Sequence, residues 1–255
     1  MSLEVVTIPC LKDNYAFLAR DGATGTVALV DAPEAGPIEA ALAERGWKLD
    51  LILITHHHAD HIDGVEPLRR NHGAQVWGAA ADAHRLPPLD RQLAAGDAVA
   101  IGESTGTVLA VPGHTLGHIA FHFPADRVAF TADSLMAAGC GRVFEGTHAQ
   151  MWHSLSQFLD MDPQTRICSG HEYTEANIRF ALTIEPENEA LQARARKVAQ
   201  RRARGEPTVP SLLAGELATN PFLRARLPEV KAAVGLPDAD DAAVFAEIRR
   251  RKDSF

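Results

Sequence analysis

Residues 51–61 read LILITHHHADH, a run of four apolar residues followed by a histidine-rich segment. A short, continuous apolar run is typical of a strand buried on both faces. The loops that follow such strands are where α/β proteins place binding and catalytic groups. The stretch therefore predicts a buried strand whose end carries a cluster of metal-binding side chains.

The spacing within this cluster predicts two neighbouring metal positions. Side chains two residues apart in extended backbone point the same way, so His56 and His58 can converge on one metal while the histidine between them points away. The chain is then expected to turn into a helix near residue 62, and Asp60 and His61 can aim at a second metal. The alternative is a histidine-rich surface loop, which four histidines and an aspartate after a buried strand make improbable.

Three later strands are also expected to end on metal-binding side chains. His114 follows the strand ending at 111, Asp133 follows 128–131, and His171 follows 166–168. Each alone is weak, because an aspartate can cap a helix and a histidine can occupy a turn. Together the candidates number seven: His56, His58, Asp60, His61, His114, Asp133 and His171. Seven ligands exceed one tetrahedral zinc and suit two metals that share a bridging carboxylate.

The order of expected elements predicts an α/β domain followed by a helical one. Alternating or continuous apolar runs indicate strands at 5–8, 15–19, 26–30, 51–54, 74–77, 106–111, 119–123, 128–131 and 166–168. Helical composition and spacing cover 37–45, 149–159, 174–182, 188–204, 241–252 and the neighbourhood of 232–234. Strand signals largely disappear after about residue 173. We therefore expect a metal-binding catalytic domain over 1–172 and a helical substrate-binding domain over 173–255.

Composition restricts the classes of function. The chain has 255 residues and a net charge of −8, which disfavours a general nucleic-acid binder because phosphate contacts need Lys and Arg. Its three widely spaced cysteines match neither a disulfide scaffold nor a CxxC zinc site. Residues 1–20 lack the pattern of a signal peptide, and no apolar stretch is long enough to span a bilayer. We therefore expect a cytoplasmic protein.

The motif at 55–61 is the Thr-His-x-His-x-Asp-His signature of the metallo-β-lactamase superfamily, within which the chain resembles the glyoxalase II family. The superfamily motif alone is shared by many activities, whereas the later blocks are more specific to this family. The resemblance runs nearly end to end: PCLKDNY (9–15), THHHADHIDG (55–64), PGHTLGH (112–118), FTADSLMAAGCGRVFEGT (130–147), GHEYT (170–174), EPEN (185–188), ATNPFLR (218–224) and RRRKDSF (249–255).

The resemblance implies an αββα sandwich with a small C-terminal helical domain, and two divalent metal ions. These would be zinc, with iron or manganese as alternatives. It assigns one metal to His56, His58 and His114, and the other to Asp60, His61 and His171. Asp133 would bridge the two metals.

The resemblance also implies which residues bind the glutathione half of the substrate. They are Arg142, Phe144, Tyr173, Arg249 and Lys252, although the spacing leaves Arg250 and Arg251 as alternatives to Arg249. Phe144 stands where many relatives carry a tyrosine, and Arg142 stands where many carry a lysine. The missing hydroxyl at position 144 removes one hydrogen bond to glutathione, worth about 1 kcal/mol net.

The activity implied is hydrolysis of S-(2-hydroxyacyl)glutathione, such as S-D-lactoylglutathione, to glutathione and a 2-hydroxy acid (D-lactate), in methylglyoxal detoxification. A hydroxide bridging two metals is available near neutral pH because metal binding lowers the pKa of water from 15.7 toward about 7. Asp60 and Asp133 would orient this hydroxide. The expected partner is this small-molecule thioester, with no nucleic acid and no membrane, and the expected state is a monomer.

Other functions on the same scaffold would require different sites. A persulfide dioxygenase needs one iron in a two-histidine, one-carboxylate site, which leaves several of the seven ligands unused. A nuclease needs a basic groove, and a non-catalytic metal-binding module would hydrolyse no thioester. Cys140 could in principle be a nucleophile, but the sequence pairs it with no base, and we expect it to serve packing.

Overall fold

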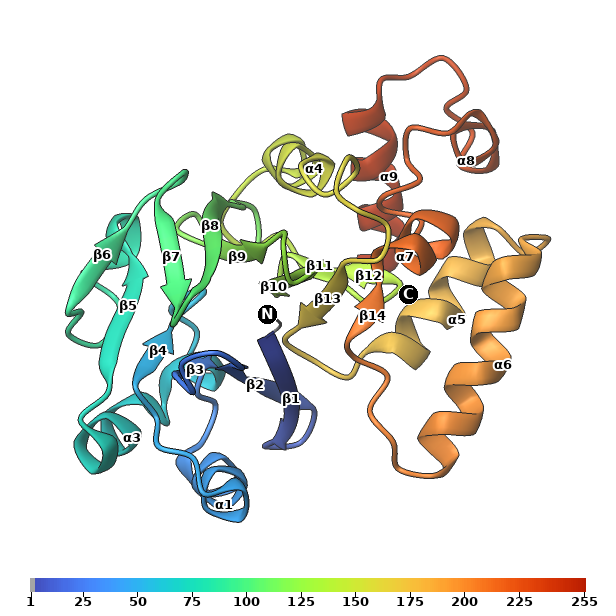
Figure 1. Cartoon of the computed structure of the whole chain (residues 1–255). Helices are drawn as coiled ribbons and strands as arrows, with labels where there is room; N and C mark the ends of the chain where they lie inside the picture. The colour runs from blue at the N-terminus through green and yellow to red at the C-terminus, as the bar shows by residue number, and fades with distance from the viewer. Residues whose placement is uncertain (1–2) are drawn as a thin grey trace.

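The computed structural model describes residues 3–255 and arranges them in four layers, in the order helix, sheet, sheet, helix (Figure 1). Helices α1 (Ala35–Arg45) and α3 (Val65–His72) cover the outer face of the first sheet. Helix α4 (His148–Ser156) and the C-terminal helices cover the outer face of the second. The predicted αββα sandwich with C-terminal helices is confirmed.

The first sheet contains the buried strand that opens the metal-binding motif. Its strands run in the order β1 (Leu3–Cys10), β2 (Asn14–Asp21), β3 (Val27–Val30), β4 (Leu51–Leu53), β5 (Gln75–Ala79) and β6 (Arg91–Leu93). The first three are antiparallel, and β3 to β6 are parallel. Leu51 and Leu53 enter the core between the sheets, while Ile52 packs on the helical side. Burial on both faces explains the continuous apolar run.

The second sheet contains the strands that lead into all three later ligands. Its order is β14 (Ser211–Leu212), β13 (Arg166–Ser169), β10 (Val128–Ala132), β9 (Ile119–Phe123), β8 (Ser104–Ala110) and β7 (Ala98–Ile101). Only β10 and β13 are parallel, so their carboxyl ends lie at the same edge. Phe121 and Phe130 fill the core between the sheets, and Ala120 and Ala129 face the helices.

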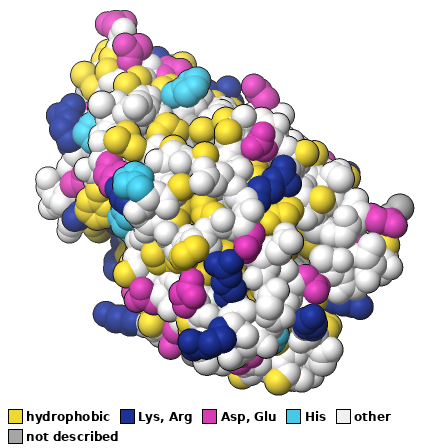
Figure 2. Space-filling view, turned by 90° about the vertical axis from the view of Figure 1, so that its left-hand side faces the viewer, with side chains coloured by type: hydrophobic (Ala, Val, Ile, Leu, Met, Phe, Trp, Pro, Cys, Tyr) yellow, Lys and Arg dark blue, Asp and Glu magenta, His cyan; other side chains and the backbone are white. Residues whose placement is uncertain are grey.

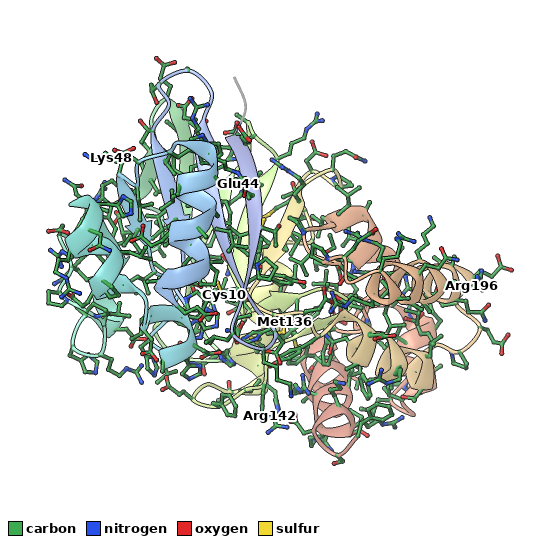
Figure 3. The ribbon with its side chains drawn as sticks, turned by 90° about the horizontal axis from the view of Figure 1, so that it is seen from below. Cys10, Glu44, Lys48, Met136, Arg142 and Arg196 are labelled. Atoms are coloured by element: carbon green, nitrogen blue, oxygen red, sulfur yellow. The ribbon has the colours of Figure 1, made fainter. Side chains whose placement is uncertain are left out.

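The chain after β13 is mostly helical and packs on the second sheet. Its helices are α5 (Thr174–Ile184), α6 (Glu189–Ala203), α7 (Leu213–Thr219), α8 (Pro228–Ala233) and α9 (Asp241–Asp253). Phe245 and Ile248 of α9 share one buried cluster with Ala120 and Ile167 of the sheet. Seen from below in Figure 3, this helical part extends to Arg196, on the side opposite Lys48.

Several short elements differ from the sequence-based expectation. The helix expected near residue 62 begins earlier, as α2 (Ala59–Ile62). Strands β6 and β7 and the hairpin of β11 (Leu135–Met136) with β12 (Gly139–Cys140) were not predicted, nor was the 3₁₀ turn Ala80–Asp82. Strand β14 lies within the part expected to be helical and pairs with β13. A strand of two residues has no periodicity that could reveal it.

The surface carries interspersed charges. On the face that Figure 2 presents, Lys and Arg side chains are scattered among acidic side chains rather than gathered in one strip. A nucleic-acid groove needs clustered basic side chains, which this face does not offer. Among residues 3–255, no helix combines the length and the apolar character needed to cross a membrane.

Candidate metal centre

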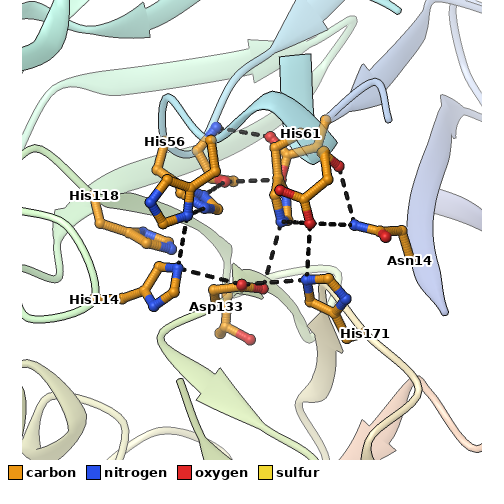
Figure 4. Close-up of polar contacts among 12 residues, drawn as sticks. Asn14, His56, His61, His114, His118, Asp133 and His171 are labelled. Atoms are coloured by element: carbon orange, nitrogen blue, oxygen red, sulfur yellow. Dashed lines mark hydrogen bonds and ion pairs between the residues drawn. The ribbon is translucent and has the colours of Figure 1, made fainter. Parts of the chain in front are cut away.

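The seven candidate ligands converge from four segments of the chain (Figure 4). Strand β4 leads into the first segment, and β8, β10 and β13 lead into the other three. In chain order, the four segments carry the following ligands: His56, His58, Asp60 and His61; His114; Asp133; and His171. Strand ends from both sheets thus meet at one place.

Three imidazoles form the first group. Nε2 of His56 lies 3.2 Å from Nδ1 of His58, which lies 3.0 Å from Nε2 of His114. Burial lowers the pKa of all three rings, so each is neutral at pH 7. Neutral imidazoles offer the lone pairs that a metal requires.

A second group consists of Asp60, His61 and His171, and Asp133 lies between the two groups. Oδ2 of Asp60 lies 3.5 Å from Nε2 of His171 and 3.9 Å from Nε2 of His61. Oδ2 of Asp133 lies 3.3 Å from Nε2 of His171 and 3.4 Å from Nε2 of His114. Its Oδ1 lies 3.6 Å from Nε2 of His61. Asp133 therefore faces both groups at once.

The charges of the second group are strongly coupled. Burial raises the pKa of Asp133, but His61 and His171 outweigh burial and hold that pKa well below its usual value. Burial lowers the pKa values of the two histidines, but nearby carboxylates outweigh burial and raise both pKa values: Asp133 with Asp31 for His61, and Asp133 with Asp13 for His171. The Asp133 carboxylate and the two imidazoles thus stabilise each other's charged forms.

Two buried polar atoms of these residues lack a hydrogen-bond partner and so indicate whether a metal ion fits here. Nε2 of His61 and Oδ1 of Asp133 have no hydrogen-bond partner within the described chain. Leaving such an atom unsatisfied costs about 1–3 kcal/mol, a cost that coordination to a divalent cation removes. Imidazole and carboxylate ligands suit zinc, iron or manganese. The residues therefore fit a divalent metal centre.

A glycine permits the close approach of two ligands. A Cβ on Gly170 would collide with Oδ1 of Asp133 and would lie 2.8 Å from Cε1 of His61. Gly170 also donates its N–H to the carbonyl of Ala132, at 3.0 Å. The loop after β13 can pass this close to the ligands only without a side chain at this position.

Asp31 orients a ligand and was missed by the sequence analysis. Its Oδ2 lies 2.8 Å from Nδ1 of His61 and accepts a hydrogen bond from the Thr55 hydroxyl, while its Oδ1 accepts from the Thr55 N–H. Asp31 also lies near His56 and His61 in a geometry that could hold a metal. Because its oxygens are already engaged, we assign it to orienting His61. Its position directly after the expected strand 26–30 was the available signal.

Two further histidines flank the centre. His57 lies outside the ligand groups, with its Nδ1 3.2 Å from Asp82 and its Nε2 3.6 Å from Glu145, as backbone alternation predicted. His118 stacks on His56 with ring centroids 4.6 Å apart. Burial lowers the pKa of His118 to about 3, so this ring is neutral.

A cavity of about 410 Å³ opens beside the metal ligands. His58, Asp60, His114, Asp133 and His171 line one part of it. The rest of its wall includes all five predicted substrate-binding residues, together with four others: Arg142, Phe144, Tyr173, Arg249 and Lys252, then Met136, Cys140, Gly141 and Asn177.

The three cations of the wall differ in exposure. Arg249 is 4% exposed and donates to the Cys140 carbonyl at 3.2 Å. Lys252 is half-buried, and burial lowers its pKa. Arg142 is exposed, near the boundary between the sheets and the C-terminal helices (Figure 3). Asp253 pairs with Arg249 at 2.9 Å and lies 3.4 Å from Arg142, so one carboxylate offsets part of their charge.

The neighbouring arginines point elsewhere. Arg250 and Arg251 both pair with Glu247, at 2.7 and 2.9 Å, and neither lines the cavity. Of the three consecutive arginines, Arg249 is the one that lines the cavity.

Two aromatic side chains border the ligands. Phe144 is 61% exposed, and its ring centroid lies 5.2 Å from that of His114 and 5.9 Å from that of His58. Tyr173 stacks on His171 at 4.7 Å. Burial, followed by the charge of Asp13, raises the pKa of Tyr173 to about 12, so its hydroxyl stays a hydrogen-bond donor at neutral pH.

Cys140 is buried beside Arg249 rather than paired with a base. Burial raises the pKa of its thiol to about 11, which leaves it protonated and unreactive at neutral pH. This agrees with the packing role expected from the sequence. All three cysteines are buried and free.

Comparison with known families identifies two adjoining parts of the chain. Residues 13–171 match the metallo-β-lactamase superfamily, and residues 172–255 match the C-terminus of hydroxyacylglutathione hydrolase. A hydroxyacylglutathione hydrolase from Cereibacter sphaeroides is 64% identical over 255 residues, which cover all of both chains.

Solved structures share the fold. ETHE1 from Myxococcus xanthus superposes with a TM-score of 0.66 over 98% of this chain and 90% of its own, at 24% identity. A protein named TTHA1623, solved in a di-iron-bound form, gives a TM-score of 0.57 over 66% of this chain and 91% of its own, at 28% identity.

Replacing Gly170 should weaken metal binding. We expect Gly170→Ala to lower metal affinity by about 10–100-fold, the range typical of disturbed ligand surroundings, because its Cβ displaces Asp133 or His61. Metal content after equilibration with a chelator of known affinity measures the effect. Gly36→Ala in α1, where a Cβ meets nothing within 4 Å, is the matched control. Equal metal affinity in both variants would contradict the packing argument.

Proposed function

Because the chain belongs to the hydroxyacylglutathione hydrolase family of the metallo-β-lactamase superfamily, we propose that it hydrolyses S-D-lactoylglutathione at a binuclear metal centre. The chain is a metal-dependent thioester hydrolase. Its products are glutathione and a 2-hydroxy acid, here D-lactate, which gives it a role in methylglyoxal detoxification.

One observation carries the proposal: metal-ligand side chains and a group of cationic and aromatic side chains line the same cavity. Glutathione bears two carboxylates, and an acidic chain would repel it without a local basic surface. Arg142, Arg249 and Lys252 provide that surface beside the ligands. We propose that they bind the glutathione half, together with Tyr173 and Phe144. Residues 173–255 would thus act as the substrate-binding domain, and 1–172 as the catalytic one.

We assign the ligands to two divalent ions, zinc with iron or manganese as alternatives. His56, His58 and His114 would hold one, Asp60, His61 and His171 the other, and Asp133 would bridge them. Bound in this way, the ions would supply Lewis acidity, which lowers the pKa of water toward about 7 and polarises the thioester carbonyl. The di-iron form of the relative TTHA1623 is consistent with two ions.

The residues of the chain then orient the reactants. Asp60 and Asp133 line the cavity, where their carboxylates would accept hydrogen bonds from the attacking water. The water oxygen would bond to the carbonyl carbon as one water proton passes to solvent, the C–S bond would break, and its electron pair would leave with sulfur as a thiolate. The carboxylic acid formed would release its remaining proton to solvent. A thiolate whose conjugate acid has a pKa of about 8.5 leaves readily, so no general acid is needed. The Tyr173 hydroxyl, protonated at neutral pH, would donate to the glutathione backbone.

We further propose that the protein acts as a cytoplasmic monomer. Three free, buried thiols favour a reducing compartment. The mass of the protein in solution tests the monomer.

Thioester hydrolysis itself is the direct test. We expect the metal-loaded chain to consume S-D-lactoylglutathione with release of one free thiol per thioester, and chelator-stripped protein to regain activity when zinc is returned. Metal analysis should give two ions per chain. Absence of metal-dependent hydrolysis would overturn the proposal, and oxygen consumption with a persulfide would indicate a dioxygenase instead.

Removing one cation should weaken substrate binding selectively. We expect Lys252→Ala to raise KM by about 10-fold or more with a smaller effect on kcat, because an ionic hydrogen bond is worth about 1.5–3 kcal/mol and lies remote from the reacting carbon. Steady-state kinetics measure the split. Arg250→Ala, an exposed neighbour that pairs with Glu247, should leave both constants unchanged. A loss confined to kcat would refute the binding role of Lys252.

Restoring a hydroxyl at position 144 should strengthen binding. We expect Phe144→Tyr to lower KM by about 5-fold, equivalent to about 1 kcal/mol for one net hydrogen bond. Phe144 is exposed at the cavity, so the added hydroxyl meets no packing obstacle. Phe144→Leu, which removes the ring without adding a donor, is the comparison. If Phe144→Tyr leaves KM unchanged, the hydroxyl does not contact glutathione.

A further inference from the structure

We propose that Asp13 and Asn14, at the turn between β1 and β2, are positioning residues for the second metal group, and that they act through Asp60 and His171. Asp13 directly precedes β2, and Asn14 is the first residue of β2. Both lie far in sequence from every candidate ligand. This inference rests on the proposed binuclear centre and names residues outside its ligand set.

Asn14 holds the carboxylate of Asp60. Its Nδ2 donates to Oδ2 of Asp60 at 2.9 Å and to the Asp60 carbonyl at 3.0 Å (Figure 4). Asn14 is 4% exposed, whereas the Asp60 side chain is 41% exposed. The oxygen that accepts from Asn14 is the same one that faces Nε2 of His61 and of His171. Asn14 therefore restrains the side chain of a partly exposed candidate ligand.

Asp13 holds the ring of His171. Its Oδ1 lies 3.0 Å from Nδ1 of His171. Since an ionised carboxylate only accepts hydrogen bonds, this contact favours a ring proton on Nδ1, so that Nε2, on the side of Asp133 and Asp60, would be the atom that binds the metal. A carboxylate behind a histidine fixes its tautomer and orientation in this way at many metal sites.

Backbone contacts fasten this turn to the loop that carries His171. The Tyr15 N–H donates to the Gly170 carbonyl at 2.7 Å, and the Glu172 N–H donates to the Asp13 carbonyl at 2.8 Å. Asn14 and His171 form an isolated β-bridge. The Tyr15 hydroxyl donates to Glu172 at 2.6 Å. These contacts fix the turn against the loop, so the side chains of the turn can orient two ligands.

The first group is oriented by other residues. Nδ1 of His56 lies 3.0 Å from the Thr55 hydroxyl, and Nδ1 of His114 lies 2.8 Å from the Arg142 carbonyl. Neither Asp13 nor Asn14 hydrogen-bonds to a ligand of this group among the described residues. Loss of the turn's side chains should therefore weaken the second metal and spare the first.

Zinc titration of the metal-free full-length chain against a competing chelator dye tests this selectivity. We expect two zinc ions in the unaltered protein. In Asn14→Ala and Asp13→Ala one ion should bind as tightly as in the unaltered protein, while the other, which we assign to the second group, binds about 10–100-fold more weakly. Asp13→Asn keeps an acceptor oxygen for His171 and should retain more of the second ion than Asp13→Ala. Lys12→Ala, an exposed neighbour in the same turn, should match the unaltered protein.

The outcomes separate this inference from the proposed function. Two unchanged zinc affinities in Asn14→Ala and Asp13→Ala would overturn the inference alone, as would equal weakening of both ions, which indicates a general structural role. A single zinc ion in the unaltered protein would overturn the binuclear centre and the inference with it. If Asp13→Ala fails to fold, as judged by circular dichroism, then Asn14→Ala and Asp13→Asn decide the question.

Discussion

Asp133 is a buried carboxylate that contacts His61, His114 and His171. The side chains arranged around it compensate the unfavourable free energy of burying its charge. An uncompensated buried charge is strongly unfavourable, so imidazoles from three other segments must reach the end of β10. Two packed sheets bring those segments to one place because their strand ends meet there. The backbone next to Asp133 is strained as well, since Ala132 has a φ of 41°, in a region that costs non-glycine residues about 1 kcal/mol or more.

The helical part of the chain is structurally continuous with the catalytic layers. Phe245 of α9 and Ile167 of β13 belong to one buried cluster, and β14 extends the second sheet. Arg249 of α9 donates to the carbonyl of Cys140, in the hairpin that follows β10. Two of the cations that line the cavity, Arg249 and Lys252 of α9, are therefore held beside the candidate ligands by shared packing.

The parts of the fold that sequence analysis predicted are those with strong local patterns. The run 51–54 is apolar because β4 is covered on both faces, and the long helices carry clear helical spacing. Strand β7 was missed because two of its four residues are exposed alanines, which weakens the alternation. Strand β14 is created by its pairing with β13, and no local preference encodes it.

The chemistry expected at the centre can be inferred from short stretches of sequence, because ligand type and spacing along a strand end are local properties. His56 and His58 could be paired on one metal from backbone alternation alone, and the family blocks pointed to the glutathione thioester. The residues that orient those ligands become apparent only in the folded chain. Asp13 and Asn14 reach His171 and Asp60 across 158 and 46 positions of the chain. Such contacts depend on how loops are packed at the sheet edge, which spacing along the chain does not encode.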